Sequence, residues 1–353
     1  SLPEPIILSI DAMGGDHAPA MVIDGLKQAY KTLRGVSYLV FGDEALIRPL
    51  LEQDQVLSSL CEIRHTDGVV TDTQKASQAV RQGRNTSMWQ AIQSVKSGEA
   101  HGVVSAGNTG ALMGMALVQL RTLPGIDRPA IATVLPSMKG DVVVLDLGAN
   151  AECDAKNLVD FAIMGEVFSR TVLGKERPSV GILNIGSEDQ KGHEGVRSAH
   201  EILRNSDHLQ LKFDGFVEGD DIAKGTVDVV VTDGFTGNVL LKTAEGTAKF
   251  YSSLLKDAFR SSLLSRLGYL LASSALNAVR KRTDPRRYNG AMFLGLRGIC
   301  VKSHGGTDAF GFSNAIRVAV GLVANGFNDR ILEEFEQLEL NGHETPAPKV
   351  ASN

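Results

Sequence analysis

The sequence has few cysteines, and none is placed for a disulfide framework or a structural zinc site. Cys61, Cys153 and Cys300 are far apart, odd in number and outside any C-x-x-C pattern. None of the eight histidines falls in an H-E-x-x-H pattern. We therefore expect no metal site and no disulfides, which is usual in the reducing cytosol.

Several common catalytic and nucleotide-binding motifs are also missing. The chain contains no G-x-x-x-x-G-K-[ST], no G-x-G-x-x-G and no G-x-S-x-G pattern. Their absence argues against a Walker-type nucleotide site, against NAD bound in the usual manner and against a serine hydrolase. We expect no cofactor. The net charge of −5 gives no indication of nucleic-acid binding.

Neither a signal peptide nor a membrane-spanning helix is expected. The first apolar run, residues 6–10, has no basic residue before it and no cleavage site. Residues 101–120 lack Asp, Glu, Lys and Arg and would be long enough to span a bilayer. However, Ser105, Asn108, Thr109 and several glycines divide that run into a strand and a helix. We expect a cytoplasmic protein.

What the chain has is an alternation of short apolar runs with amphipathic helical stretches, and 37 glycines in 353 residues. Near-continuous apolar strands separated by helices predict an α/β fold, with a mostly parallel sheet covered by helices on both faces. We expect one catalytic unit over residues 1–340 and a loose C-terminal tail over residues 341–353. The strands are predicted at residues 6–10, 38–41, 102–105, 130–135, 142–145, 179–183, 227–231 and 299–302.

One stretch departs from this alternation. Residues 243–282 are helical in pattern without a strand, which predicts a helical hairpin inserted over residues 243–290. The hairpin could pack on the core or on a twin subunit, or it could contact a membrane surface or an acidic partner. The side chains we assign to such a contact are Leu263, Leu267, Leu270, Leu271, Arg280, Lys281, Arg282, Arg286 and Arg287.

Six predicted strands are each followed by a turn rich in Gly, Asp and Asn. Ligands bind at the carboxyl ends of the strands in open parallel sheets, so we expect these turns to converge on one crevice. Glycine turns that open a helix present backbone N–H groups to an anion. The residues alone thus predict an enzyme that binds a small anion, such as phosphate. The turns are residues 11–16, 105–111, 146–150, 184–192, 232–238 and 304–308.

These turns resemble the signature blocks of the PlsX family, the acyl-ACP:phosphate acyltransferases. The blocks include S-I-D-A-M-G-G-D at residues 9–16, V-S-A-G-N-T-G-A at 104–111, D-L-G-A-N-A at 146–151, L-N-I-G-S-E at 183–188 and T-D-G-F-T-G-N at 232–238. The resemblance implies transfer of a fatty acyl group from acyl carrier protein to inorganic phosphate. The acyl phosphate would serve a glycerol-3-phosphate acyltransferase in bacterial phospholipid synthesis.

The resemblance also implies the fold of isocitrate and isopropylmalate dehydrogenases and of phosphotransacetylases. It implies a homodimer attached peripherally to the cytoplasmic face of the membrane. Within this frame, we assign phosphate binding to Gly107, Asn108, Thr109 and Gly110 together with Lys191.

The remaining turn residues are assigned to the thioester carbonyl and to protons. Asn184 and Asn238 are candidate donors to the oxyanion, beside the backbone of residues 234–237. Asp233 or His304 would manage protons, and Asp11 or Asp16 would orient a donor.

Other interpretations remain open. Cys153 could form a covalent acyl-enzyme, although no histidine is near it in sequence. The chain could instead be a phosphotransacetylase-like enzyme that uses acyl-CoA. It could also be a non-catalytic membrane scaffold in which the hairpin is the functional part.

Overall fold

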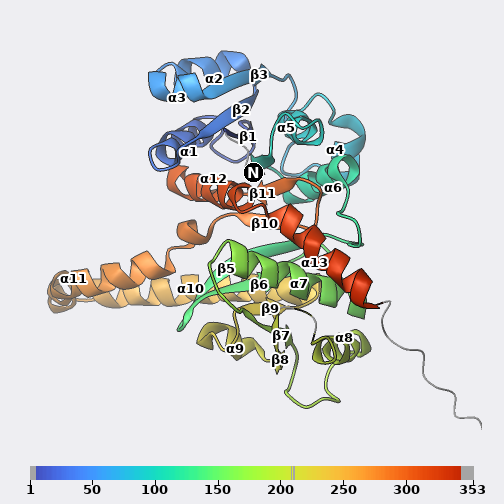
Figure 1. Ribbon diagram of the computed structural model, residues 1–353. Helices are drawn as coiled ribbons and strands as arrows, with labels where there is room; N and C mark the ends of the chain where they lie inside the picture. The colour runs from blue at the N-terminus through green and yellow to red at the C-terminus, as the bar shows by residue number, and fades with distance from the viewer. Residues whose placement is uncertain (1–4, 208, 210, 343–353) are drawn as a thin grey trace, which may run out of the picture.

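A computed structural model describes residues 5–207, 209 and 211–342 of the chain, so most of the tail expected over residues 341–353 lies outside the described residues. The described chain is built on an eleven-stranded sheet in the order β3-β2-β1-β4-β11-β10-β5-β6-β9-β7-β8 (Figure 1). The strands are β1 (Ile6–Asp11), β2 (Val36–Gly42), β3 (Cys61–His65), β4 (Gly102–Ser105), β5 (Ala130–Ser137), β6 (Gly140–Leu145), β7 (Ser179–Leu183), β8 (Lys212–Val217), β9 (Val229–Val231), β10 (Ala291–Leu294) and β11 (Ile299–Lys302).

Helices cover both faces of the sheet, which confirms the predicted α/β class (Figure 1). The helices are α1 (Ala20–Tyr30), α2 (Glu44–Leu51), α3 (Gln55–Leu60), α4 (Ala76–Gln82), α5 (Ser87–Lys96), α6 (Thr109–Leu120), α7 (Ala155–Thr171), α8 (Glu194–Arg204), α9 (Gly219–Lys224), α10 (Gly234–Arg260), α11 (Leu263–Thr283), the 3₁₀ helix η1 (Pro285–Tyr288), α12 (Ala309–Ala324) and α13 (Phe327–Gly342).

The direction of the strands reverses in the middle of the sheet. β1, β2, β3, β4 and β11 are parallel to one another, and so are β6, β7, β8 and β9. Between these halves, β10 is antiparallel to both β11 and β5, and β5 is antiparallel to β6. As a result, the carboxyl ends of the two parallel halves lie at opposite edges of the sheet.

The two faces of the sheet bury separate groups of apolar side chains. Side chains alternate along a strand, so Val103 and Cys300 face the side covered by α5 and α6. Val104 and Val301 face the side covered by α1 and α12. In the other half, Leu240 and Leu241 of α10 pack against the sheet beside β6. Helices α6 and α10 begin within the polar turns at residues 105–111 and 232–238.

The predicted helical segment is present as two long helices that project from the sheet (Figure 1). α10 begins at Gly234 rather than at Thr243, because the Asp233 side chain caps it by accepting from the Thr236 N–H at 2.8 Å. No residue of α11 is buried, and only Gly234 and Gly237 of α10 are. Within the described residues, no helix is long and apolar enough to cross a membrane.

Candidate active site

The six polar turns form two clusters at opposite edges of the sheet. The first cluster joins residues 11–16, 105–110 and 303–308, which follow β1, β4 and β11. The second joins residues 146–150, 184–192 and 232–238, which follow β6, β7 and β9. The expectation that all six meet in one crevice is therefore wrong for the single chain, because antiparallel β10 and β5 reverse the second half of the sheet.

The side chain of Asp11 connects the turns of the first cluster through hydrogen bonds. Its carboxylate accepts from the hydroxyl groups of Ser87 at 2.6 Å and Ser105 at 2.7 Å, and from the Met13 N–H at 3.2 Å. Burial raises the pKa of Asp11, and these hydrogen bonds oppose that rise. Ser105 in turn accepts from the Gly107 N–H at 3.0 Å. Asp11 thus orients neighbouring groups of the turns, while its role toward a substrate stays a prediction.

In the turn that precedes α6, the Asn108 side chain already makes hydrogen bonds within the protein. Asn108 caps the helix by accepting from the Ala111 N–H at 3.1 Å. Its amide nitrogen donates to the carbonyl oxygens of Thr71 at 3.1 Å and Gln74 at 2.8 Å. Thr109 and Gly110 are exposed at the start of the helix. The groups of this turn most open to an anion are therefore the backbone and hydroxyl of Thr109 and the backbone of Gly110.

His304 and Asp16 lie on adjoining turns of the first cluster. The backbone N–H of Asp16 donates to the carbonyl of Gly305 at 2.8 Å, and the Asp16 side chain is exposed. The His304 N–H donates to the Asn289 side chain at 2.9 Å, and its Nε2 lies 3.8 Å from Oε1 of Glu245 on α10. Partial desolvation lowers the pKa of His304, and Glu245 opposes this change. The imidazole is therefore neutral, and able to accept a proton, over a wider range of pH.

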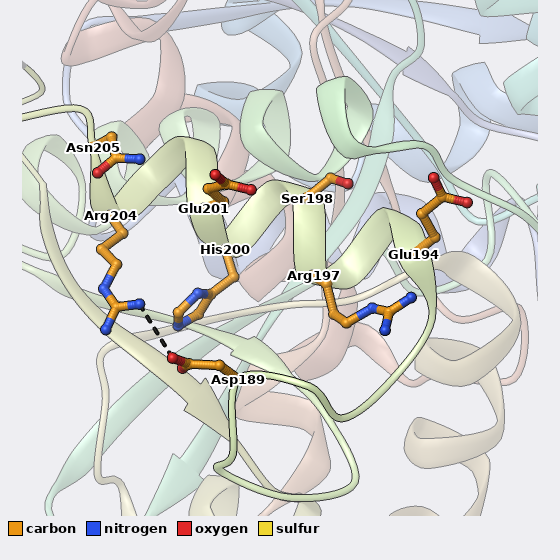
Figure 2. A pocket seen from close by; sticks show the side chains of 8 residues that line it. All are labelled: Asp189, Glu194, Arg197, Ser198, His200, Glu201, Arg204 and Asn205. Atoms are coloured by element: carbon orange, nitrogen blue, oxygen red, sulfur yellow. Dashed lines mark hydrogen bonds and ion pairs between the residues drawn. The ribbon is translucent and has the colours of Figure 1, made fainter.

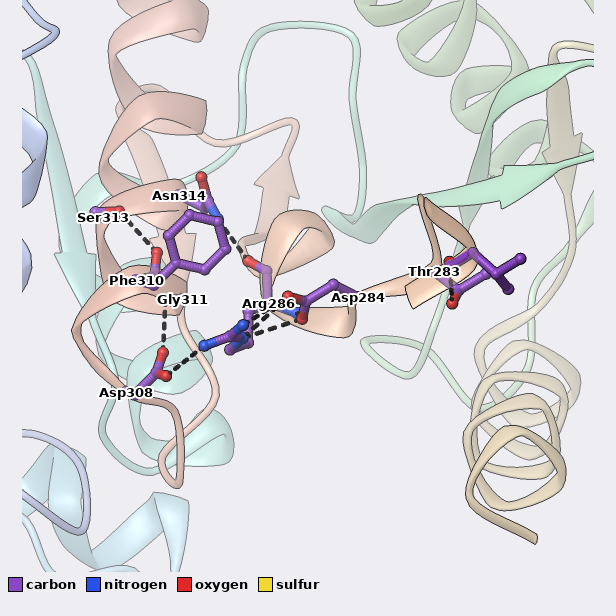
Figure 3. A network of polar contacts seen from close by, with 9 residues as sticks. Thr283, Asp284, Arg286, Asp308, Phe310, Gly311, Ser313 and Asn314 are labelled. Atoms are coloured by element: carbon purple, nitrogen blue, oxygen red, sulfur yellow. Dashed lines mark hydrogen bonds and ion pairs between the residues drawn. The ribbon is translucent and has the colours of Figure 1, made fainter. Parts of the chain in front are cut away.

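The base of the hairpin is fastened to the same turn (Figure 3). Arg286 of η1 donates to Asp284 and, at 2.8 Å, to Asp308, and its guanidinium lies 4.9 Å from the ring centre of Phe310. Asp308 caps α12 by accepting from the Gly311 N–H at 3.0 Å. Both limbs of the hairpin therefore contact residues 304–308, α10 through Glu245 and η1 through Arg286.

Asp146 anchors the first turn of the second cluster. Its carboxylate accepts from the backbone N–H groups of Ile131 at 3.0 Å, Gly148 at 3.2 Å, Ala149 at 3.0 Å and Asn150 at 2.8 Å. Burial raises the pKa of Asp146, and the N–H donors oppose that rise. With these hydrogen bonds formed, Asp146 serves to hold the loop.

The other predicted residues of this cluster differ in how many hydrogen bonds their side chains make within the protein. Asp233 accepts from both the N–H and the hydroxyl of Thr236, at 2.8 and 2.9 Å. Asn184 donates to the Lys191 carbonyl at 3.0 Å and so closes its own loop. Asn238 makes a long contact of 3.4 Å to the Leu147 carbonyl and is exposed, as is Lys191. Asn238 and Lys191 are therefore the side chains most open to a ligand here.

Helix α10 connects the two clusters. It begins at Asp233 in the second cluster and brings Glu245 beside His304 in the first. These two residues are separated by about 18 Å along the helix axis, at 1.5 Å per residue. Lys191 and the turn at residues 107–110 lie at opposite edges of the sheet. One phosphate ion cannot contact both within one chain.

Several residues of the first cluster were not singled out from the sequence. Ser87, Glu245 and Asn289 come from elements that fold onto the cluster from elsewhere in the chain. Lys302 is buried, and burial lowers its pKa to about 8. The signal for Lys302 was present, because it is a lysine at the end of an apolar strand and two residues before His304.

The thiol of Cys153 is not activated. Burial raises its pKa to about 12, and Sγ makes a long contact of 3.9 Å to the Asn150 carbonyl. A reactive cysteine has a lowered pKa instead.

The described residues also contain no group of three or more His, Cys, Asp or Glu side chains arranged to hold a metal ion.

One cavity lies apart from these assignments, along α8 (Figure 2). It has a volume of about 620 Å³, and its lining carries two basic side chains, Arg197 and Arg204, and three acidic ones, Asp189, Glu194 and Glu201. Arg204 pairs with Asp189 at 3.3 Å. His200 stacks on Phe216 with ring centres 4.2 Å apart, and burial lowers its pKa. Burial therefore favours the neutral form of this histidine.

Comparisons with known proteins agree over nearly the whole chain. Residues 6–330 match the family model described as fatty acid synthesis protein. The chain is 64% identical over 335 residues to the phosphate acyltransferase of Rhodospirillum rubrum, covering 95% of this chain and 96% of that protein. It is 52% identical to the phosphate acyltransferase of Caulobacter vibrioides, covering 95% and 93% of the two chains.

Solved structures share the fold at low sequence identity. The EutD phosphotransacetylase from Staphylococcus aureus superposes with a TM-score of 0.59 at 16% identity, covering 90% of this chain and 94% of that one. A branched-chain phosphotransacylase from Enterococcus faecalis gives a TM-score of 0.58 at 16% identity, covering 90% and 99%. This agrees with the fold expected from the sequence.

Proposed function

The chain belongs to the PlsX family, whose model is described as fatty acid synthesis protein, and we propose that it transfers a fatty acyl group from the thioester of acyl carrier protein to inorganic phosphate. The observation that carries this proposal is 64% identity, over 95% of the chain, to a protein named phosphate acyltransferase. The product, an acyl phosphate, would be consumed by a glycerol-3-phosphate acyltransferase in phospholipid synthesis.

The reaction requires orientation more than proton transfer. An oxygen of phosphate attacks the thioester carbon, a C–O bond forms, the C–S bond breaks, and the thiolate leaves with the electron pair. The carbonyl oxygen carries negative charge on the way. Because a thiolate is a weakly basic leaving group, holding the phosphate and stabilising the oxyanion should supply most of the rate acceleration.

We assign the roles to the groups of each cluster that remain open to a ligand. In the first cluster, Thr109 and Gly110 would hold phosphate at the start of α6, where the helix dipole favours an anion. His304 would accept the proton of a phosphate monoanion, since its lowered pKa keeps the imidazole neutral although it makes it a weaker base. In the second cluster, the exposed Asn238 and Lys191 are proposed donors to the thioester carbonyl or its carrier.

Because the two clusters are far apart in one chain, the proposed roles require that the thioester still reach the bound phosphate. The acyl chain must bring its thioester to the edge where phosphate is bound, or a second copy of the chain must bring the two clusters together. The homodimer inferred from the family resemblance is the proposed way of meeting that condition.

The hairpin is the proposed contact for the membrane surface and for acyl carrier protein. Leu263, Leu270 and Leu271 are 82%, 67% and 81% exposed. Exposed apolar side chains flanked by basic residues suit an anionic bilayer or an acidic partner. Arg286 is already paired with two carboxylates, so Arg280, Lys281 and Arg287 are the better candidates for that contact.

A direct assay tests the reaction. Purified protein would be incubated with palmitoyl-carrier protein or palmitoyl-CoA, with and without inorganic phosphate. Release of the free thiol would be followed, and acyl phosphate would be trapped as the hydroxamate. We expect phosphate-dependent product from the carrier-protein thioester. Product from CoA alone would instead indicate a phosphotransacetylase-like enzyme, and no product from either, with the fold intact, would favour a scaffold.

A further inference from the structure

We propose that Lys302 is a phosphate-binding residue, and that it supplies the positive charge beside the turn that opens α6. The inference rests on the proposed function, because it concerns the acceptor substrate of that reaction. Lys191 had been assigned to this phosphate, but it lies at the opposite edge of the sheet. Lys302 is a buried lysine at the edge of the sheet that holds the turn at residues 107–110.

The strand register places Lys302 next to the turn. Lys302 is the last residue of β11 and pairs with Ser105, the last residue of β4. The backbone continues this contact, since the Ser303 N–H donates to the Ser105 carbonyl at 2.9 Å. Three residues beyond Ser105 the chain reaches Asn108, the cap of α6. The ammonium group and the N-terminus of α6 therefore belong to the same edge of neighbouring strands.

The alternation of side chains places Lys302 on the same face as α6. Cys300 packs with the side chains of α5 and α6, whereas Val301 packs on the opposite face with α12. With a period of two, Lys302 returns to the α6 face. The carboxylates that act on its ammonium are Asp11, at the end of β1, and Asp72 and Asp16, in loops. Asp72 also accepts from Asn108 through its carbonyl, at 3.3 Å.

The ammonium of Lys302 lacks an anionic partner. Lys302 is 8% exposed, and Nζ donates to the carbonyl of Ser303. Within the described part of the chain, no carboxylate lies within ion-pair distance of it. An ammonium carries three donors, and burying one without a counter-ion is costly. A bound phosphate would provide the missing charge.

The neighbouring carboxylates do not exclude an anion. Burial raises the pKa of Asp11, which favours its neutral form, although the hydroxyl hydrogen bonds from Ser87 and Ser105 oppose that rise. Asp16 and Asp72 are exposed, so water and salt screen their charges.

Phosphate binding and turnover by Lys302→Met and Lys302→Arg would test the assignment. Methionine retains the length and apolar stem without the charge, and arginine retains the charge. Lys96→Met, an exposed lysine at the end of α5, is the matched control, and Lys191→Met tests the competing assignment. The KM for phosphate would be measured at saturating acyl thioester, and phosphate binding without thioester by calorimetry.

We expect Lys302→Met to raise the KM for phosphate by about 10- to 100-fold and to weaken calorimetric binding equally, as for a lost hydrogen bond to a charged group. Lys302→Arg should recover part of the loss, and Lys96→Met should match the wild type. A folded Lys302→Met with a KM within about twofold of the wild type would overturn the assignment. So would a loss confined to Lys191→Met.

The wild-type protein gives a second test that needs no variant. Lys302 has a pKa of about 8 and is charged below it, so the KM for phosphate should rise as pH increases through about 8. Inorganic phosphate is already a dianion in that range. A flat profile in the wild type would contradict the inference even if Lys302→Met failed to fold. Absence of product from the wild type would refute the proposed function, and calorimetric phosphate binding would still decide the role of Lys302.

Discussion

The α-carbon of Gly237, in the first turn of α10, packs directly against the carbonyl oxygen of Asp146. A Cβ atom at position 237 would overlap that oxygen. The contact seats the start of α10 on the turn that follows β6, and Gly234 adds a hydrogen bond from its N–H to the Asn150 carbonyl at 2.7 Å.

Gly237→Ala should therefore be strongly destabilising, by about 2–4 kcal/mol, because the helix start must move off the turn. Gly246→Ala is the matched control on the same helix, since a Cβ there meets nothing within 4 Å. That change should stabilise the protein by up to about 1 kcal/mol through helix propensity. Urea unfolding of both variants measures the difference. Similar midpoints would show that the contact has no energetic importance.

Removing Arg286 should loosen the base of the hairpin. Arg286→Ala loses contacts to Asp284 and Asp308, and the stacking on Phe310, and it leaves the two carboxylates facing each other. The network is partly exposed, so the expected loss is about 1–2 kcal/mol, and it should shrink at high salt. Arg287→Ala, the exposed neighbour, is the control. Equal urea midpoints for the two variants would contradict the prediction.

The buried carboxylate of Asp160 should make stability depend on pH. Burial raises its pKa to about 6 from 3.8, although Lys156, at 2.8 Å, opposes the rise. The folded state then binds this proton more tightly than the unfolded state. Its contribution to stability is present below about pH 4 and is lost as pH rises through about 6.

Asp160→Asn should abolish that dependence and be more stable than the wild type at pH 7.5 by about 1–3 kcal/mol. Asp127→Asn is the comparison, because Asp127 also pairs with Lys156, at 3.3 Å, but is 61% exposed. Thermal unfolding between pH 4 and 8 measures both. Parallel curves for Asp160→Asn and the wild type would refute the argument.

Polar substitutions on the hairpin should weaken the proposed membrane binding without affecting the fold. Replacing Leu263, Leu264 and Leu271 with Ser removes apolar side chains that are 82%, 79% and 81% exposed. Co-sedimentation with vesicles of anionic lipid should fall by about tenfold or more. Leu46→Ser, a half-exposed leucine on α2, should bind as the wild type does. Undiminished binding by the triple variant would exclude the hairpin as the membrane contact.

The sequence predicted the class of fold because the apolar strands and the glycine turns are local features. β1, β4, β7 and β11 were all predicted within a residue of their observed bounds. The reversal at β10 was not predicted, since residues 291–294 are short and carry no sign of strand direction.

That reversal is also why the candidate site could be read only in part. Each turn was identified from its own residues, but which turns are neighbours depends on the order and direction of the strands. Asn108 was predicted to bind phosphate, yet its amide donates to the loop at residues 71–74, about 35 positions away in sequence. Long-range contacts of this kind leave no local pattern.

Helix α10 is held near its N-terminal end and projects beyond Glu245, so small rotations there become larger displacements at its far end. The helix is held at Gly237 and again where Glu245 meets His304, and beyond that point it extends about 22 Å to Arg260, at 1.5 Å per residue. A pivot of about 5° at Glu245 would move the far end by about 2 Å over that length. A load applied at the tip would act on the turn at residues 304–308 through two attachments, Glu245 and Arg286.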